Sequence, residues 1–185
     1  VQTVRAAQKR YEDQEHYLTL VSFNSDAVKT IYDCVKAERV EELTAAQYQP
    51  NCATPLYDAM GNALNQLRKN VADNDAVLVT IITDGYENDS REYNSVTIKA
   101  LVEGLKAKGW LFTYIGANQN VEEVAATISI TNTLEFCANE AGTEAMFARE
   151  RKARNRGFSR LSEKISQTFM ADDYFADEDG DELKS

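Results

Sequence analysis

The sequence predicts a mixed α/β domain built on a doubly wound, mostly parallel sheet. From Tyr17 onward, strand-like segments alternate with amphipathic helical segments, the order typical of strands joined by helical crossovers. Segment 77–83 is an almost continuous apolar run, as expected for a strand buried on both faces. The run stops at Asp84 and Gly85, and open α/β sheets bind ligands where their strands end.

Each predicted element has its own signal. Strands 17–23 and 110–116 are rich in β-branched and aromatic residues, and 27–35 alternates like an edge strand that completes an early hairpin. The helix after Thr54 and Pro55 has its apolar residues on one stripe, and we expect Thr54 to be its N-cap. The remaining predicted elements are helices at 1–12, 95–108, 121–128 and 143–168, a loop or short helix at 41–53, and a last strand at 133–137.

Length and charge predict one domain, residues 1–170, followed by an acidic, disordered tail, residues 171–185. The tail holds seven of the 30 acidic residues but one of the 20 basic residues. Nucleic acid is therefore not an expected partner, and the apolar runs are too short to predict a membrane span. Three widely spaced cysteines favour reduced thiols and a cytoplasmic location.

Most enzyme chemistries lack a sequence signal, so we expect a protein that is not an enzyme. The sole histidine, His16, lies in a polar run at the start of a strand and is expected to be solvated. No Ser/His/Asp set, no Cys/His pair and no glycine-rich phosphate loop occurs in the sequence. A Rossmann-like nucleotide or phosphate enzyme is an alternative function, but the glycine fingerprint of such enzymes follows none of the predicted strands.

Two segments resemble loops of a known family. Residues 51–60 read Asn-Cys-Ala-Thr-Pro-Leu-Tyr-Asp-Ala-Met, and residues 82–88 read Ile-Thr-Asp-Gly-Tyr-Glu-Asn. They resemble the second and third loops of von Willebrand factor type A domains, especially the bacterial intracellular versions. The resemblance implies a three-layer α/β/α, Rossmann-like fold with one antiparallel edge strand.

The family also implies a binding function. Its metal-ion-dependent adhesion site holds Mg²⁺ or Mn²⁺ at the strand ends, and the resemblance places Thr54 and Asp84 among the metal ligands. Hydroxyl and carboxylate oxygens are the hard ligands that such cations prefer. The expected partner is another protein, which would complete the metal site with a carboxylate.

The family's first loop, D-x-S-x-S, is not present in this sequence. In the family, the strand that carries this loop would lie between strands 17–23 and 77–83. Because the metal ligands of the loop are missing, metal binding by this chain is expected to be weak or absent. Upstream residues of the natural protein are our preferred occupant of that place. A strand donated by another chain, which would make an oligomer, and direct pairing of the two strands are the alternatives.

Residues beyond the metal pair are predicted to contact a partner. They lie on strand-end loops or on the basic helix predicted near the C-terminus: Ser25, Asp26, Asn118, Arg149, Arg151 and Arg154. A metal-independent interaction or scaffold domain, using the basic helix and the acidic tail, is the alternative function.

Overall fold

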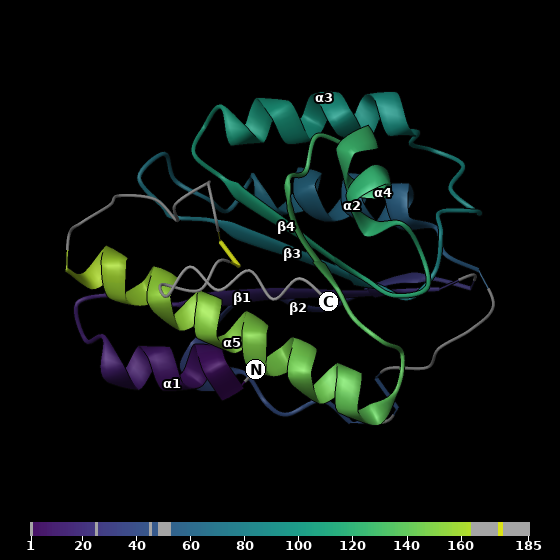
Figure 1. Ribbon diagram of the computed structural model, residues 1–185. Coiled ribbons are helices and arrows are strands. Elements are labelled where there is room, and N and C mark those ends of the chain that lie inside the picture. The colour runs from purple at the N-terminus through teal and green to yellow at the C-terminus, as the bar shows by residue number, and fades with distance from the viewer. Residues whose placement is uncertain (1, 25, 45, 48–52, 164–173, 176–185) are drawn as a thin grey trace.

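The computed structural model describes residues 2–24, 26–44, 46–47, 53–163 and 174–175. The described chain is a mixed α/β structure with strands and helices in alternation after the first hairpin (Figure 1). Its helices are α1 Gln2–Arg10, α2 Leu56–Leu67, α3 Ser95–Lys106, α4 Val121–Thr127 and α5 Glu140–Ser162, with a short 3₁₀ turn η1 Ala37–Arg39. Its strands are β1 Tyr17–Phe23, β2 Val28–Lys36, β3 Leu78–Thr83, β4 Leu111–Gly116 and β5 Asn132–Glu135.

The core of the molecule is a parallel sheet in the order β3-β4-β5. Every residue of β4 is buried, which confirms the strand that the apolar sequence around 111–116 predicts. Successive β4 side chains point to opposite faces, so Phe112 and Tyr114 join one apolar cluster while Leu111 and Ile115 join another. A strand of this kind must be covered by helices on both sides.

Helices cover both faces of the parallel sheet. Residues of α2, α3 and α4 pack on one face, around Leu56, Ile98 and Val121. Residues of α1 and α5 pack on the other face, around Ala7 and Met146. Figure 1 shows these two groups of helices on opposite sides of β3 and β4. Across the described ranges, no helix is both long and apolar enough to cross a membrane.

Strands β1 and β2 form an antiparallel hairpin, as the sequence predicts. The simple alternation predicted for residues 27–35 is wrong, because the register shifts twice between Leu18 and Val21. Cys34 has a positive φ of 50°, and its N–H donates to Thr19 Oγ1 at 3.0 Å. The bulged hairpin is partly or fully exposed along its length. Strand β3, which the sequence predicts to be buried on both faces, is also only partly buried, and Ile82 is 40% exposed.

The hairpin and the parallel sheet are separate ladders. Among the described residues, β1 pairs with β2, β3 pairs with β4, and no backbone hydrogen bond joins β1 to β3. A single doubly wound sheet is therefore not present in the described chain, and direct pairing of strands 17–23 and 77–83 does not occur there. Strands β1 and β3 are therefore each bonded on one side within this part of the protein.

Several helix boundaries follow local sequence signals. Asn94 begins α3 in a capping box with Thr97, and Gly109, with φ of 86°, follows its C-terminal end. Helix α5 begins earlier than predicted, because Asn139 caps it by accepting from Gly142 N at 2.8 Å. The part of the predicted helix at 164–168 lies outside the described residues.

Candidate functional site

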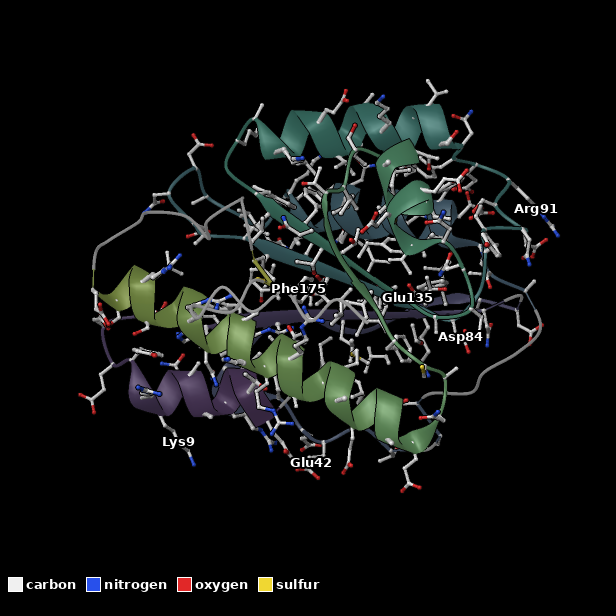
Figure 2. All side chains as sticks on the ribbon, viewed as in Figure 1. Lys9, Glu42, Asp84, Arg91, Glu135 and Phe175 are labelled. Atoms are coloured by element: carbon white, nitrogen blue, oxygen red, sulfur yellow. The ribbon has the colours of Figure 1, made fainter. Side chains whose placement is uncertain are left out.

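The candidate site begins where β3 ends. Thr83 is buried, and its hydroxyl accepts from Gly85 N at 3.3 Å and donates to Gly85 O at 3.0 Å. This local turn leads the chain out of the sheet and leaves Asp84 exposed. Figure 2 shows Asp84 at the end of the molecule toward which β3 and β4 run. This is the place where open α/β sheets bind their ligands.

The fold brings Thr54 to the same place. A β-carbon built on Gly85 would lie 3.0 Å from Thr54 Oγ1, so this hydroxyl rests against the glycine beside Asp84. Two hydrogen bonds join the segments: Thr54 N donates to Asn88 Oδ1 at 2.8 Å, and Asn88 N donates to Thr54 O at 3.2 Å. The two sequence segments that resemble adjacent family loops are therefore neighbours in space.

The predicted role of Thr54 as a helix cap is wrong. Helix α2 begins at Leu56 with Pro55 in the capping position, and no side chain of that position caps it. The first helical amides are bonded by the other loop instead: Tyr57 N donates to Glu87 Oε2 at 2.8 Å, and Asp58 N donates to Ser90 Oγ at 3.0 Å. Helix amides can be capped from a distant segment because only an acceptor oxygen is required.

Glu87 holds the loop after β3 in a defined shape. Its carboxylate accepts from the backbone of Asp89 at 3.0 Å and of Ser90 at 2.8 Å, in addition to Tyr57 N and Ser90 Oγ. Hydrogen bonds from backbone amides to a carboxylate are among the stronger ones in proteins. The loop and the first turn of α2 are therefore one hydrogen-bonded unit.

Asp58 makes a second connection of the same kind. Its carboxylate accepts from the backbone amides of Arg91, Glu92 and Tyr93 at 2.8 to 2.9 Å. Burial raises the pKa of Asp58, but these amides together outweigh it and hold the pKa below its usual value. Asp58 is thus charged and engaged in positioning the loop.

The turn between β4 and α4 completes the site edge. Asn118 is exposed and has a positive φ of 58°, and the hydroxyl of Tyr86 accepts from Asn120 N at 3.3 Å. Below it, buried Gln119 accepts from the Tyr114 hydroxyl at 3.4 Å, and burial raises the pKa of Tyr114 to about 12. The loop after β3 and the β4–α4 turn are therefore also connected.

The other predicted partner residues are dispersed. Ser25 lies outside the described residues, and Asp26 is exposed in the β1–β2 turn. Arg149 and Arg151 are exposed on α5, whereas Arg154 is half-buried and forms an ion pair with Glu150. Of these residues, Asn118 belongs to the edge that contains Thr54 and Asp84.

This edge supplies few metal ligands. Thr54 and Asp84 offer one hydroxyl and one carboxylate, and no cluster of three or more His, Cys, Asp or Glu side chains suited to a metal occurs among the described residues. Mg²⁺ needs six oxygens in near-ideal octahedral geometry. The residues present fit a loosely held cation with water in most positions, and they do not form a complete metal cage.

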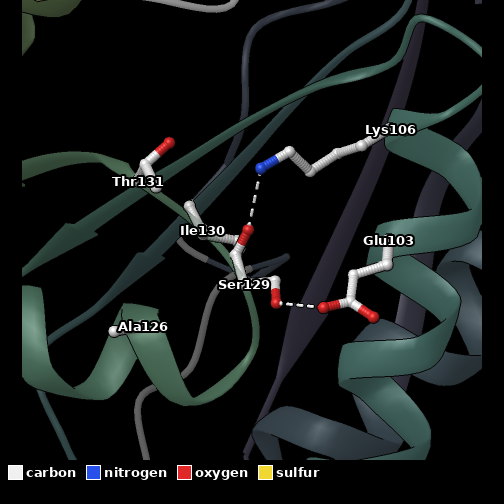
Figure 3. Close-up of a pocket in the computed structure, with 6 residues that line it drawn as sticks. All are labelled: Glu103, Lys106, Ala126, Ser129, Ile130 and Thr131. Carbon is white, nitrogen blue, oxygen red and sulfur yellow. Dashed lines mark hydrogen bonds between the residues drawn. The ribbon is translucent and has the colours of Figure 1, made fainter.

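A groove lies at the opposite end of the parallel sheet from Asp84. It is an open groove of about 510 Å³ between α3 and the segment before β5 (Figure 3). Lys106 Nζ donates to Ser129 O at 3.0 Å, and Ser129 Oγ donates to Glu103 Oε1 at 2.7 Å. Because these polar groups bond to one another, the fold itself accounts for their positions without a ligand.

His16 is buried, which contradicts the prediction that it is solvated. It is 8% exposed, and its ring packs edge-on against Phe158 with the ring centroids 4.6 Å apart. Its backbone N–H donates to Gln8 Oε1 at 2.8 Å, and this bond links the residue before β1 to helix α1. Burial lowers the pKa of His16, and the nearby Asp13 carboxylate only partly opposes this shift.

Sequence reasoning missed the residues that assemble the site. Asp58, Glu87 and Asn88 lie inside the two family-like segments, yet they bond backbone amides instead of projecting toward a ligand. The sequence offered two signals: the carboxylate of Asp58 in the first turn of a predicted helix, and the Glu87-Asn88 pair shortly after the strand-end glycine. The bonds that join the two segments link residues 30 or more positions apart, so the sequence pattern alone does not reveal them.

Comparisons with known proteins assign no family to this site. The chain matches no protein-family model, no curated protein and no solved structure.

Proposed function

We propose that this chain is a protein-binding module of the von Willebrand factor A type, with its binding face at the carboxyl end of β3. The observation that carries the proposal is the contact of Thr54 Oγ1 with Gly85, which places a hydroxyl beside the exposed Asp84. Asn88 accepts a hydrogen bond from Thr54 N and Glu87 accepts one from Tyr57 N, and these bonds hold the two segments together. A preorganised polar edge of this kind loses little conformational entropy when a partner binds.

The chemistry of the edge supports binding more than catalysis. Its best-positioned carboxylates, Asp58 and Glu87, are engaged by backbone amides, and His16 is buried in the other cluster of the molecule. Asp84 and Asn118 remain exposed. Exposed polar groups on a rigid loop are suited to contacts with a second protein. We place the module in the cytoplasm, because Cys34 and Cys137 are free thiols.

The proposal includes a weakly held divalent cation. Thr54 and Asp84 would contribute two oxygens to Mg²⁺ or Mn²⁺, with waters in the other positions. A carboxylate from the partner would replace one water and strengthen the complex. The cation would then serve as a bridge, and its affinity in the absence of partner would be no tighter than about millimolar.

Mn²⁺ titration of the isotope-labelled chain tests this site, because the paramagnetic ion broadens nearby amide signals. We expect broadening at Thr54 and Gly85 at millimolar Mn²⁺, with the amide of Val102 in α3 as an internal control. Asp84→Ala should abolish the effect, whereas Asp26→Ala should leave it unchanged. Added acetate should lower the Mn²⁺ concentration needed. Equal broadening in the parent and Asp84→Ala chains would refute the site.

A metal-independent interaction domain is the second candidate. It is favoured by the small number of oxygen ligands at the edge and by the exposed Arg149 and Arg151 on α5. The same titration discriminates the two candidates. Absence of broadening around Thr54 at several millimolar Mn²⁺ would favour the metal-independent function.

A further inference from the structure

Two residues of the predicted acidic tail are part of the core. Tyr174 is 6% exposed and Phe175 is 8% exposed, and their rings pack edge-to-face with the centroids 5.0 Å apart. Both lie in the cluster on the α1 and α5 side of the parallel sheet, near residues such as Leu111 and Leu134. Figure 2 shows Phe175 against this part of the sheet. The aromatic pair therefore fills space that α5 alone does not cover.

Side chains of the domain bond the main chain of this pair. Arg156 Nη2 donates to Tyr174 O at 2.7 Å, and Tyr174 N donates to Asn132 Oδ1 at 3.4 Å. Asn132 is itself positioned by its Nδ2 group, which donates to Phe112 O at 3.4 Å. A receptor commonly recognises a linear peptide in this way, with polar groups on the peptide backbone and apolar space for its side chains.

The surroundings of the tyrosine ring limit how tightly it is held. The phenol lies near Glu150 and Arg154, an ion pair whose carboxylate side chain is 7% exposed and whose guanidinium side chain is 18% exposed. Covering such a pair removes water from both charges, and this cost opposes the gain from burying the rings. This cost lowers the net free energy that docking of the pair contributes.

Charge complements this apolar contact. Acidic residues flank the aromatic pair in the sequence, namely Asp172, Asp173, Asp177, Glu178 and Asp179. The basic residues of α5 that interact with Tyr174 are Arg154 and Arg156. An acidic segment with two adjacent aromatic residues therefore matches this face in both polarity and charge.

We propose that Tyr174 and Phe175 are a tethered ligand of this face, and that the same segment of a second copy of the chain can take their place. The tether gives the chain's own segment a high effective concentration, so it excludes the second copy in dilute solution. At high protein concentration the segments exchange between two copies, which is a low-cost route to a dimer. The occupant of the face is thus the Tyr174-Phe175 segment, from the same chain or from a second copy.

Hydrogen exchange in the unmodified chain tests whether the pair is a ligand or fixed core. The Tyr174 amide is bonded to Asn132, and release of the segment would expose it without opening the sheet. We expect its protection to be at least tenfold lower than that of Ile115 and Leu134 in the same cluster. Equal protection of all three amides would overturn the proposal, because the pair would then open with the core.

A peptide-binding experiment tests the second occupant. The probe is a fluorescent peptide of residues 171–179, and the receptor is the full chain with Tyr174→Ala and Phe175→Ala. The peptide should bind this receptor at least tenfold more tightly than it binds the unmodified chain. Adding Arg156→Ala should weaken binding at least fivefold, and a peptide with both aromatic residues changed to alanine should not bind.

Two results would refute the exchange. One is equal or absent binding of the peptide to the unmodified chain and to the double variant. The other is failure of the double variant to fold, because a tethered ligand is not required for the sheet to form. Arg151→Ala, on the exposed part of α5, serves as the matched control for Arg156→Ala and should leave the affinity within twofold.

Discussion

Glu87 is the residue on which the geometry of the candidate site depends most. Its two oxygens accept four hydrogen bonds, which connect the loop after β3 to the first turn of α2. We expect Glu87→Ala to lower the free energy of unfolding by about 2–4 kcal/mol, because several donors lose a charged acceptor. Thr54→Ala should change it by less than about 0.5 kcal/mol, because the Thr54 hydroxyl makes no hydrogen bond among the described residues.

Urea unfolding of the two variants measures this difference. Ser90→Ala is the matched control, since it removes one hydroxyl and leaves the carboxylate in place; its cost should be about 1 kcal/mol. If Thr54→Ala proves as damaging as Glu87→Ala, Thr54 has a structural role that the hydrogen bonds of the described chain do not explain.

His16 makes the stability of the fold depend on pH. Burial lowers the pKa of His16 in the folded state, while in the unfolded chain it stays near the ordinary value of about 6.5. Its contribution is therefore fully present above about pH 6.5 and decreases as the pH falls below that value toward the folded pKa. NMR titration of this single histidine should give a pKa below 6.5.

The variant His16→Phe provides the matched test, because it keeps an aromatic ring against Phe158 and cannot be protonated. Between pH 7 and pH 5, the variant should lose less unfolding free energy than the parent chain. A measured pKa of 6.5 or above in the folded chain would contradict the burial argument.

At the scale of elements, Gly61 shows how close packing overrides helix propensity. It lies within α2, and a β-carbon there would approach the ring of Tyr93 to 2.5 Å. Alanine favours a helix over glycine by about 1 kcal/mol, but overpacking typically costs about 1–3 kcal/mol. We expect Gly61→Ala to be destabilising by about 1 kcal/mol in chemical denaturation. Gly104→Ala in α3, where nothing lies near the added carbon, should instead be stabilising.

The unpaired edges of β1 and β3 predict a distinct pattern of hydrogen exchange. In the described chain, β4 is bonded on both sides, whereas β1 and β3 are each bonded on one side. Amides of β4 should exchange slowest, and alternate amides of β1 and β3 should exchange much faster. Uniformly slow exchange along β1 and β3 would mean that these edges are covered in solution, as in an oligomer.

The sequence predicted the elements better than their connections. The apolar run at 111–116 and the helix stripe at 56–67 specify their own burial, so both were found. The bulges of the hairpin and the bonds of Glu87 to Tyr57 depend on contacts between segments far apart in the chain. The candidate site was predicted from the resemblance of the Thr54 and Asp84 segments to two family loops, but the hydrogen bonds that hold these segments together could not be read from a local pattern.

For the whole molecule, the two regions to which we assign functions lie on different parts of the fold. The polar edge with Asp84 is built on the α2 side of the sheet, while the aromatic pair docks on the α5 side. Both regions are formed by a loop or tail segment that packs on the sheet through bonds to distant residues. The acidic end of the chain thus contains Tyr174 and Phe175, which pack in the core, beside acidic residues that the sequence alone would assign to solvent.

Two truncations of the tail separate these contributions. Removing residues 176–185 discards five acidic residues and little apolar surface, so the melting temperature should move by no more than about two degrees. Removing residues 174–185 also discards Tyr174 and Phe175. If their docking contributes about 2 kcal/mol, the melting temperature should fall by roughly 4–8 degrees, because each kcal/mol shifts a chain of this size by about 2–4 degrees. Differential scanning calorimetry at physiological salt measures both; an equal shift in the two truncated chains would mean that the aromatic pair adds nothing to the stability of the fold.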